Sequence, residues 1–441
     1  MVKLFDHQKT ALGYLKTNKS FAIFLDQGMG KTLIMMYHML YLLRSGKIET
    51  FLVVAPKAVL GAWERDLEMF DPEDQKILSS GMTIINYDKV WRNKDKSPYY
   101  HEWGAIILDE AHAIKNRGSE RSKFLLKLSL KCEYRYILTG TPIGNGHLEN
   151  IWSEYCFLAP HKEKRSISSE WLGTYYEFCD RYCDLNQYYQ PYRYRNVNQL
   201  QDIINEHSYR AVKSECMDLP EKLPDEIWSC EMGTDLKKYY KRLATESAII
   251  NLDLLCENPL TRMLKLRQMC SGYIQTDDDL ISVPHDKLRI LGEYLDENND
   301  KLVIFAQFRR SIKDICDLLK KKTITYVVLD GDQEDKSIWR QFQKDDQIKV
   351  IVVQYESGSA GIDLYASSTM IFYEPTIRSN TLEQARDRIH RTGQHHPCTY
   401  IHLITKGSIE EQIYKSLTNY SDFSKELFEK YLKTYTRSYA R

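Results

Sequence analysis

The sequence predicts an α/β protein that contains two successive series of strands and helices. Short apolar runs separated by helix-length segments recur in both halves of the 441 residues, and this alternation is typical of parallel sheets flanked by helices. A block between Pro142 and Leu302 differs, because it is rich in tyrosine and charge, has helical spacing and shows no series of strands. The predicted strands are 21–25, 51–55, 82–85, 105–108 and 136–139, then 302–305, 325–329, 350–353, 370–373 and 400–404.

A phosphate-binding loop follows the first predicted strand, in the stretch FAIFLDQGMGKT at 21–32. An apolar strand precedes the glycines and a helix at 33–43 follows them. Gly28 and Gly30 let backbone N–H groups face a phosphate, Lys31 adds a charge for the β- and γ-phosphates, and Thr32 offers a hydroxyl to Mg²⁺. Leu25 replaces the first glycine of the general pattern, but both glycines next to the lysine remain. A ligand-free turn is the alternative, which the flanking strand and helix disfavour.

The strand at 105–108 is followed by two adjacent carboxylates, Asp109 and Glu110, in the tetrapeptide DEAH. Asp109 is expected in the coordination shell of Mg²⁺, which keeps several waters and takes few protein carboxylates. Glu110 is expected to orient or deprotonate the attacking water. Acidic pairs after strands are common, so the tetrapeptide alone is equally consistent with a surface turn. The phosphate-binding loop upstream favours a nucleotide-hydrolysing site.

The second half should supply arginines for the γ-phosphate, since only the first half has a phosphate-binding loop. The stretch QARDRIHRTGQ at 384–394 contains Arg388 and Arg391, three apart and therefore expected on one face of a helix. Their permanent charges are suited to neutralising the transition state as arginine fingers. The alternative is a basic surface helix.

Composition limits the remaining possibilities. Lys+Arg and Asp+Glu both number 61, so the net charge is zero and any nucleic-acid footprint must be local. The longest apolar stretch, 33–43, is too short to span a bilayer, and the N-terminus lacks a secretory apolar region. Only Cys179 and Cys183 among ten cysteines are close, which favours buried free thiols over a metal site. We expect a cytoplasmic protein, or a nuclear one in a eukaryote.

Several further motifs occur in a fixed order along the chain. They are LFDHQKTALGYL at 4–15, VVAPKAVLGAWERDL at 53–67, INYD at 85–88, LTGTPIGN at 138–145, LRQMC at 266–270, VIFAQF at 303–308, LDGD at 329–332, SGSAGIDL at 357–364 and HRTGQ at 390–394. Together with the KN that follows DEAH, they make the chain resemble the Swi/Snf-type double-stranded DNA translocases, a group of superfamily 2 helicase-like ATPases.

This resemblance implies two tandem RecA-like lobes at 1–215 and 216–441. It implies helical protrusions at about 161–210 and 235–285 and brace helices at about 408–441. Gln8 is expected to read adenine, and Gly361 and Gln384 to contact the nucleotide. The implied cofactors are ATP and Mg²⁺, and the implied partner is double-stranded DNA. A monomer that relies on a separate targeting protein is the expected assembly.

Two departures from the Swi/Snf-type pattern stand in the motif at 357–364, where Ser359 replaces a usual glycine and Asp363 a usual asparagine. The segment 171–195 interleaves seven tyrosines with arginines. Such a segment can stack on bases and grip phosphates, but a helical protrusion whose tyrosines pack on one another is favoured.

The resemblance predicts an ATP-driven motor that translocates on double-stranded DNA and so remodels DNA or displaces bound proteins. A strand-separating or annealing helicase would use the same ATPase, and no separating wedge can be identified in the sequence. A non-catalytic DNA clamp is disfavoured, because Lys31, Asp109, Glu110, Arg388 and Arg391 are all present.

Overall fold

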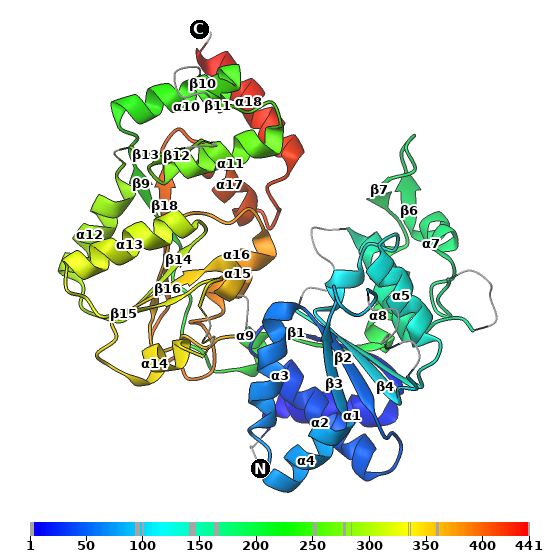
Figure 1. Cartoon of the computed structure of the whole chain (residues 1–441). Coiled ribbons are helices and arrows are strands. Elements are labelled where there is room, and N and C mark those ends of the chain that lie inside the picture. Colours follow the sequence, from blue (N-terminus) through cyan, green and yellow to red (C-terminus); the bar gives the residue numbers. More distant parts are fainter. Residues whose placement is uncertain are drawn as a thin grey trace. The chain divides into compact units, whose positions relative to one another are not determined.

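The computed structural model describes most of the chain and divides it into two compact units. The units are Met1–Asp218 and Leu219–Arg441 (Figure 1), where the sequence predicted lobes at 1–215 and 216–441. The residues described are 4–92, 98, 101–140, 147–162, 167–249, 254–276, 279–283, 285–333, 335, 337–358 and 361–439.

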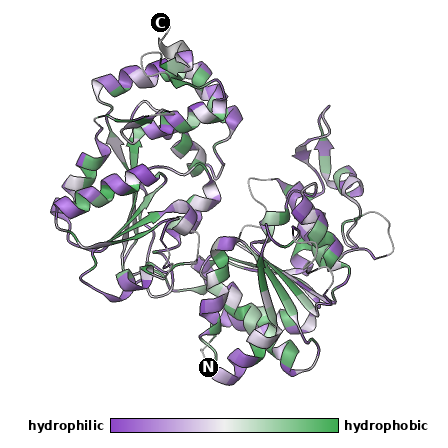
Figure 2. Ribbon diagram, viewed as in Figure 1, coloured by the Kyte–Doolittle hydropathy of each residue, from purple (hydrophilic) through white to green (hydrophobic). Residues whose placement is uncertain are grey.

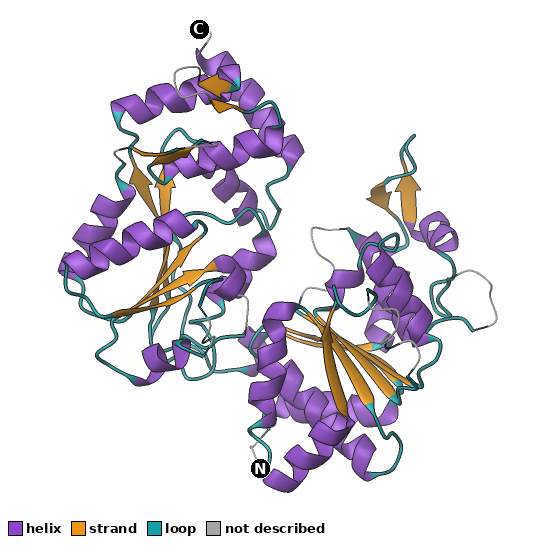
Figure 3. Ribbon diagram, in the orientation of Figure 1, coloured by secondary structure: helices purple, strands orange, loops and turns teal. Residues whose placement is uncertain are grey.

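The first unit is centred on a six-stranded parallel sheet with the strand order β3-β2-β4-β5-β1-β8. Its strands are β1 (Ser20–Leu25), β2 (Phe51–Ala55), β3 (Met82–Asn86), β4 (Ala105–Asp109), β5 (Tyr134–Thr139) and β8 (Ser208–Ala211). Helices α1 (Asp6–Thr17), α2 (Lys31–Arg44), α3 (Leu60–Leu67), α4 (Pro72–Gly81), α5 (Glu120–Ser129) and α6 (Ile151–Leu158) cover its faces. Figure 3 shows the strands between layers of helix.

The central strands β1, β2 and β4 of this sheet are apolar along their length because both faces are covered. In β1, Phe21 and Ile23 pack into the core formed with α1 and α2, while Ala22 and Phe24 pack into the core formed with α5 and α6. Figure 2 shows the same pattern as strongly hydrophobic strands beneath amphipathic helices. Continuous apolar runs therefore identified five of the six strands, and those five predictions are confirmed.

The second unit repeats this plan with the parallel strand order β15-β16-β14-β17-β18-β9. Its strands are β9 (Glu226–Cys230), β14 (Leu302–Ala306), β15 (Tyr326–Leu329), β16 (Val350–Gln354), β17 (Thr369–Phe372) and β18 (Thr399–Thr405). Its helices include α12 (Lys287–Glu297), α13 (Arg309–Lys321), α14 (Trp339–Lys344), α15 (Tyr355–Gly358) and α16 (Ser379–Arg386). The predicted pair of helix-flanked parallel sheets is confirmed.

The prediction that the block from Pro142 to Leu302 lacks sheet strands is wrong, because β8 and β9 lie within it. β8 pairs with β1 and β9 pairs with β18, each as the outermost strand of a sheet. Their sequences, SYRA and EIWSC, contain polar residues and no apolar run. An edge strand is held by backbone hydrogen bonds to one neighbour, so it needs little of the apolar pattern that marks a central strand.

The Tyr/Arg-rich segment of the first unit is not wholly helical. Helix α7 (Tyr175–Tyr182) is followed by an antiparallel hairpin of β6 (Cys183–Leu185) and β7 (Pro191–Tyr194), then by α8 (Val197–Glu206). Tyr188, Tyr189 and Tyr192 of the hairpin are 72%, 85% and 67% exposed, so the prediction that the tyrosines pack on one another is wrong for these three. The range 161–210 therefore holds a hairpin and the strand β8 besides its helices.

Two helices and two short hairpins lie beside the second sheet. The helices are α10 (Thr234–Glu246) and α11 (Pro259–Cys270), and the hairpins are β10 (Ala248–Ile249) with β11 (Leu254–Leu255), and β12 (Tyr273–Gln275) with β13 (Leu280–Ser282). The short helix α9 (Lys213–Cys216) precedes the second unit. All ten cysteines are free, and Cys179 and Cys183 are buried as predicted.

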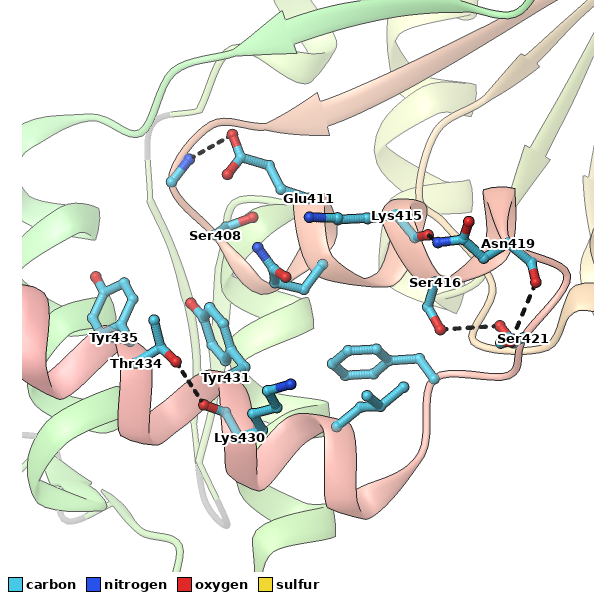
Figure 4. Close-up of a pocket in the computed structure, with 14 residues that line it drawn as sticks. Ser408, Glu411, Lys415, Ser416, Asn419, Ser421, Lys430, Tyr431, Thr434 and Tyr435 are labelled. Carbon is cyan, nitrogen blue, oxygen red and sulfur yellow. Dashed lines mark hydrogen bonds between the residues drawn. The ribbon is translucent and has the colours of Figure 1, made fainter. Parts of the chain in front are cut away.

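The C-terminal helices are α17 (Ile409–Thr418) and α18 (Lys425–Tyr439). Ser408 caps the start of α17, since its hydroxyl accepts a hydrogen bond from the backbone N–H of Glu410 at 3.1 Å. Helix α18 packs on α10, where the hydroxyls of Tyr240 and Tyr431 are 3.0 Å apart. Between α17 and α18 lies an open groove of about 620 Å³ (Figure 4). In the described part of the chain, no helix is long and apolar enough to cross a membrane.

Candidate nucleotide site

The loop between β1 and α2 has the backbone geometry of a phosphate cradle. Gly28 and Gly30 have φ angles of 80° and 78°, in the left-handed region that favours glycine. A Cβ on Gly30 would also meet Nε2 of Gln8, which is the end of a flexible side chain and could move away, so the positive φ is what requires glycine here. Helix α2 begins at Lys31 directly after Gly30, and its first N–H groups and dipole therefore face the loop.

Two predicted ligand-binding side chains contact this loop. Lys31 is buried, and its ammonium group donates hydrogen bonds to the carbonyls of Leu25 at 2.7 Å and Asp26 at 3.2 Å. Gln8 of α1 donates from Nε2 to the carbonyl of Met29 at 3.2 Å. The structure thus places Gln8 against the phosphate-binding loop, although the two lie 21 residues apart in sequence.

The acidic pair stands at the carboxyl end of β4 in the same sheet. One oxygen of Asp109 accepts from the indole N–H of Trp63 at 2.8 Å, and the other from the backbone N–H of Glu110 at 3.0 Å. The hydroxyl of Tyr87 donates to the carbonyl of Asp109 at 3.0 Å. Asp109 is therefore held from three directions, by α3, by the segment after β3 and by its own chain.

Glu110 is joined to the phosphate-binding loop by a side chain that sequence reasoning did not select. Nε2 of Gln27 donates to Oε1 of Glu110 at 2.6 Å. Glu110 has a φ of 53°, an unfavourable value for a residue with a side chain, and it turns the chain sharply after β4. In the sequence, only its position inside the loop singles out Gln27. The neighbouring residues do not indicate that its side chain contacts the residue after β4.

The two carboxylates have opposite electrostatic environments. Burial, reinforced by the negative charge of Glu110, raises the pKa of Asp109. Burial alone would raise the pKa of Glu110 too, but the hydrogen bond and charge of His112, with the charge of Lys31, lower it below its ordinary value. Glu110 is consequently ionised at neutral pH, as a residue that accepts a proton from water must be.

The residues predicted to hold Mg²⁺ fit its chemistry. Thr32 is the second residue of α2, which follows β1. Asp109 ends β4, and β5 separates β4 from β1 in the sheet. Among the described residues, no group of three or more histidine, cysteine or acidic side chains could enclose a metal. One hydroxyl and one carboxylate suit an ion that takes its remaining ligands from water and phosphate oxygens.

The predicted residues of the second unit gather around one backbone segment. Nη1 of Arg391 donates to the carbonyl of Ile362 at 3.1 Å, and Nη1 of Arg388 lies 3.5 Å from the same oxygen. Gly361, with a φ of 62°, precedes Ile362. Arg391 also forms an ion pair with Asp363. Gln384 lies one turn earlier, on α16.

The prediction that Arg388 and Arg391 share one face of a helix is wrong. Helix α16 ends at Arg386, and both arginines lie in the turns that follow. The backbone N–H of Leu364 bonds to the carbonyl of Arg388 at 2.9 Å, and Gly393 adopts a φ of 101°. These tertiary constraints end the helix. The two guanidinium groups come together because both approach the carbonyl of Ile362.

Some predicted residues fall outside the described part of the chain. Thr141 and the rest of the motif to 145 do so, as does Ser359. Thr139, at the end of β5, is described and fully buried.

Comparison with known proteins matches two domain families along the chain. A domain described as an SNF2-related domain matches residues 72–273, and a helicase conserved C-terminal domain matches residues 286–393. The chain therefore resembles SNF2-related helicase-like proteins over both matched stretches. The predicted resemblance to Swi/Snf-type proteins is therefore confirmed.

Relatives of this chain align over most of its length. An uncharacterized ATP-dependent helicase of Mycoplasma genitalium is 26% identical over 90% of the chain, and a probable ATP-dependent DNA helicase of Arabidopsis thaliana is 26% identical over 88%. The chain spans 39% of the length of each. The SWI2/SNF2 ATPase core of Sulfolobus solfataricus, solved with double-stranded DNA, is 25% identical, with 97% of this chain and 92% of that chain covered and a TM-score of 0.45.

Proposed function

We propose that the chain is an ATP-driven motor that translocates on double-stranded DNA and uses this movement to remodel DNA or displace bound proteins. The observation that carries the hydrolytic part is the convergence of Lys31, Gln27 and the Asp109–Glu110 pair at the carboxyl edge of one sheet. The choice of DNA is supported by the family and by relatives named as DNA helicases and chromatin-remodeling ATPases.

In this proposal the phosphate-binding loop holds the triphosphate of ATP through the first N–H groups of α2 and the ammonium of Lys31. Mg²⁺, held by Thr32 and Asp109, would neutralise phosphate charge. Glu110 orients the attacking water and accepts its proton, while Gln27 fixes the carboxylate that does so. Arg388 and Arg391 neutralise the charge that develops on the γ-phosphate. A cycle of binding and hydrolysis then drives movement along the DNA.

The decisive experiment measures ATP turnover with double-stranded DNA, single-stranded DNA and RNA of equal length. We expect the largest stimulation with double-stranded DNA, and loss of turnover in both K31A and E110Q. Undiminished turnover in either variant contradicts the assignment of the hydrolytic site. A large preference for RNA contradicts the proposal that the motor moves on double-stranded DNA.

A second assay separates translocation from strand separation. A translocase on duplex DNA displaces the third strand of a triplex but leaves an oligonucleotide annealed in a forked duplex. Release of the annealed strand at a comparable rate would show a strand-separating helicase built on the same ATPase.

A further inference from the structure

We infer that Asp363 is a positioning residue, whose carboxylate holds the guanidinium of Arg391 beside that of Arg388 so that the two cations act as one unit. This inference rests on the proposed function, in which both arginines meet the γ-phosphate. It goes further by giving a role to one of the two residues at which this chain departs from the Swi/Snf-type motif.

The contacts leave the Arg391 guanidinium little freedom. Its Nη1 meets both the carboxylate of Asp363 and the carbonyl of Ile362, the latter at 3.1 Å. The side chains of Arg391 and Asp363 are only 16% and 22% exposed, so water screens their charges weakly. A largely buried arginine–carboxylate contact also fixes orientation, because the guanidinium is planar and its donors have a rigid geometry.

The position of Arg388 gives the negative charge of Asp363 a second effect, on the repulsion between the two arginines. Its Nη1 approaches the carbonyl of Ile362 that Arg391 already contacts, and Arg388 is buried. Two guanidinium groups that share one carbonyl repel each other strongly where water is largely excluded. The carboxylate of Asp363 offsets part of that repulsion, whereas the neutral amide of asparagine could accept a hydrogen bond but carries no charge.

The backbone holds Asp363 in place independently of its side chain. The N–H of Leu364 donates to the carbonyl of Arg388 at 2.9 Å, which ties the segment carrying Asp363 to the segment carrying both arginines. Nε2 of Gln394 reinforces this connection by donating to the carbonyls of Ser367 at 2.8 Å and Tyr365 at 3.3 Å. Substitution of the carboxylate therefore changes the charge next to Arg391 while the two segments stay connected.

The test is a double-mutant cycle between Asp363 and Arg391, read as DNA-stimulated ATPase. We expect D363N to lower kcat about tenfold with KM for ATP changed less than about twofold, which corresponds to a loss in the transition state. R391A should lower kcat about 10³-fold. The double variant D363N/R391A should match R391A, because Asp363 acts through Arg391 alone.

The matched control is D296N, which removes an exposed carboxylate from its ion pair with the partly buried Lys322 elsewhere in the same unit. It should leave kcat unchanged. An unchanged or raised kcat in D363N, or a double variant that is slower than R391A by the full effect of D363N, overturns the inference.

A readout without turnover separates this inference from the proposed function. Nitrogen-15 NMR of the arginine side chains, with the Arg391 signals assigned through R391K, reports the rotation of its guanidinium. Slow rotation in the wild type and faster rotation in D363N are expected. A protein that shows this difference but hydrolyses no ATP contradicts the proposed function and leaves the ion pair supported. Identical signals in both proteins overturn the positioning role.

Discussion

The side-chain amide of Gln27 donates to the carboxylate of Glu110 across 2.6 Å and joins the phosphate-binding loop to the acidic pair. The two residues are 83 positions apart, on loops that follow β1 and β4, and β5 lies between these strands in the sheet. A single hydrogen bond thus connects the group expected to act on water with the loop expected to hold the phosphates.

Substitution of Gln27 should slow hydrolysis without preventing nucleotide binding. In Q27A the carboxylate of Glu110 loses a short hydrogen bond and keeps the contact with His112, whose Nδ1 lies 3.4 Å from Oε2 of Glu110. We expect kcat to fall about tenfold, the equivalent of about 1.4 kcal/mol, with KM for ATP little changed. Steady-state ATPase measurements check this, with Q75A on the surface helix α4 as the control. A rise in KM at unchanged kcat would instead assign Gln27 to ground-state binding.

Glu154 should destabilise the protein increasingly as the pH rises. It lies fully buried on α6, and neither carboxylate oxygen has a hydrogen-bond partner among the described residues. Burial, and next the charge of Glu110, raises the pKa of Glu154 well above its ordinary value. The stability that protonated Glu154 provides is therefore complete below about pH 4.5 and is lost as the pH rises toward its folded-state pKa, at about 1.4 kcal/mol per pH unit.

The comparison for this residue is E154Q, which keeps the shape and cannot ionise. Thermal unfolding followed from pH 5 to pH 8 should show the advantage of E154Q over the wild type growing with pH. The apolar variant E154L should be stabilised at pH 8 as well, because no unpaired carboxyl remains buried. A difference between wild type and E154Q that stays constant across this range contradicts the prediction.

His38 should produce the opposite pH dependence. Burial, assisted by the charges of Lys47 and Lys16, lowers the pKa of this histidine to about 3, and its Nε2 lies 2.8 Å from the hydroxyl of Tyr136. Its contribution to stability is complete above the unfolded-state pKa of about 6.5 and is lost as the pH falls toward 3. The H38Q variant should therefore be less stable than the wild type at pH 8, with the gap narrowing by about 1.4 kcal/mol per pH unit below pH 6.5. Parallel stability curves would count against this assignment.

The tyrosines of the β6–β7 hairpin should contribute little to folding. The triple variant Y188A/Y189A/Y192A removes side chains that are at least two-thirds exposed, so its melting temperature should stay close to that of the wild type. The contrasting variant Y182A empties a fully buried position in the same segment and should cost about 3–5 kcal/mol. Calorimetry of both variants checks this. Equal destabilisation by the two would show that the exposed rings pack against the protein.

The sequence alone determined the central architecture of both units and the glycine-rich turn after β1 that we propose as the phosphate-binding loop. Covered parallel strands must be apolar on both faces, so β1, β2 and β4 and their counterparts in the second unit are continuous apolar runs. The glycines of the loop and the residues Lys31, Asp109 and Glu110 are equally local signals, since each follows directly from the strand before it.

The tertiary structure decided the features that depend on a partner distant in sequence. β8 and β9 are strands because a sheet edge offers them backbone hydrogen bonds, and their own residues do not require it. The bond from Gln27 to Glu110 and the ion pair between Arg391 and Asp363 exist because loops from different strands meet at one edge of a sheet. Local sequence specifies which residues stand at each strand end. Only the order of strands in the sheet specifies which of those ends are neighbours.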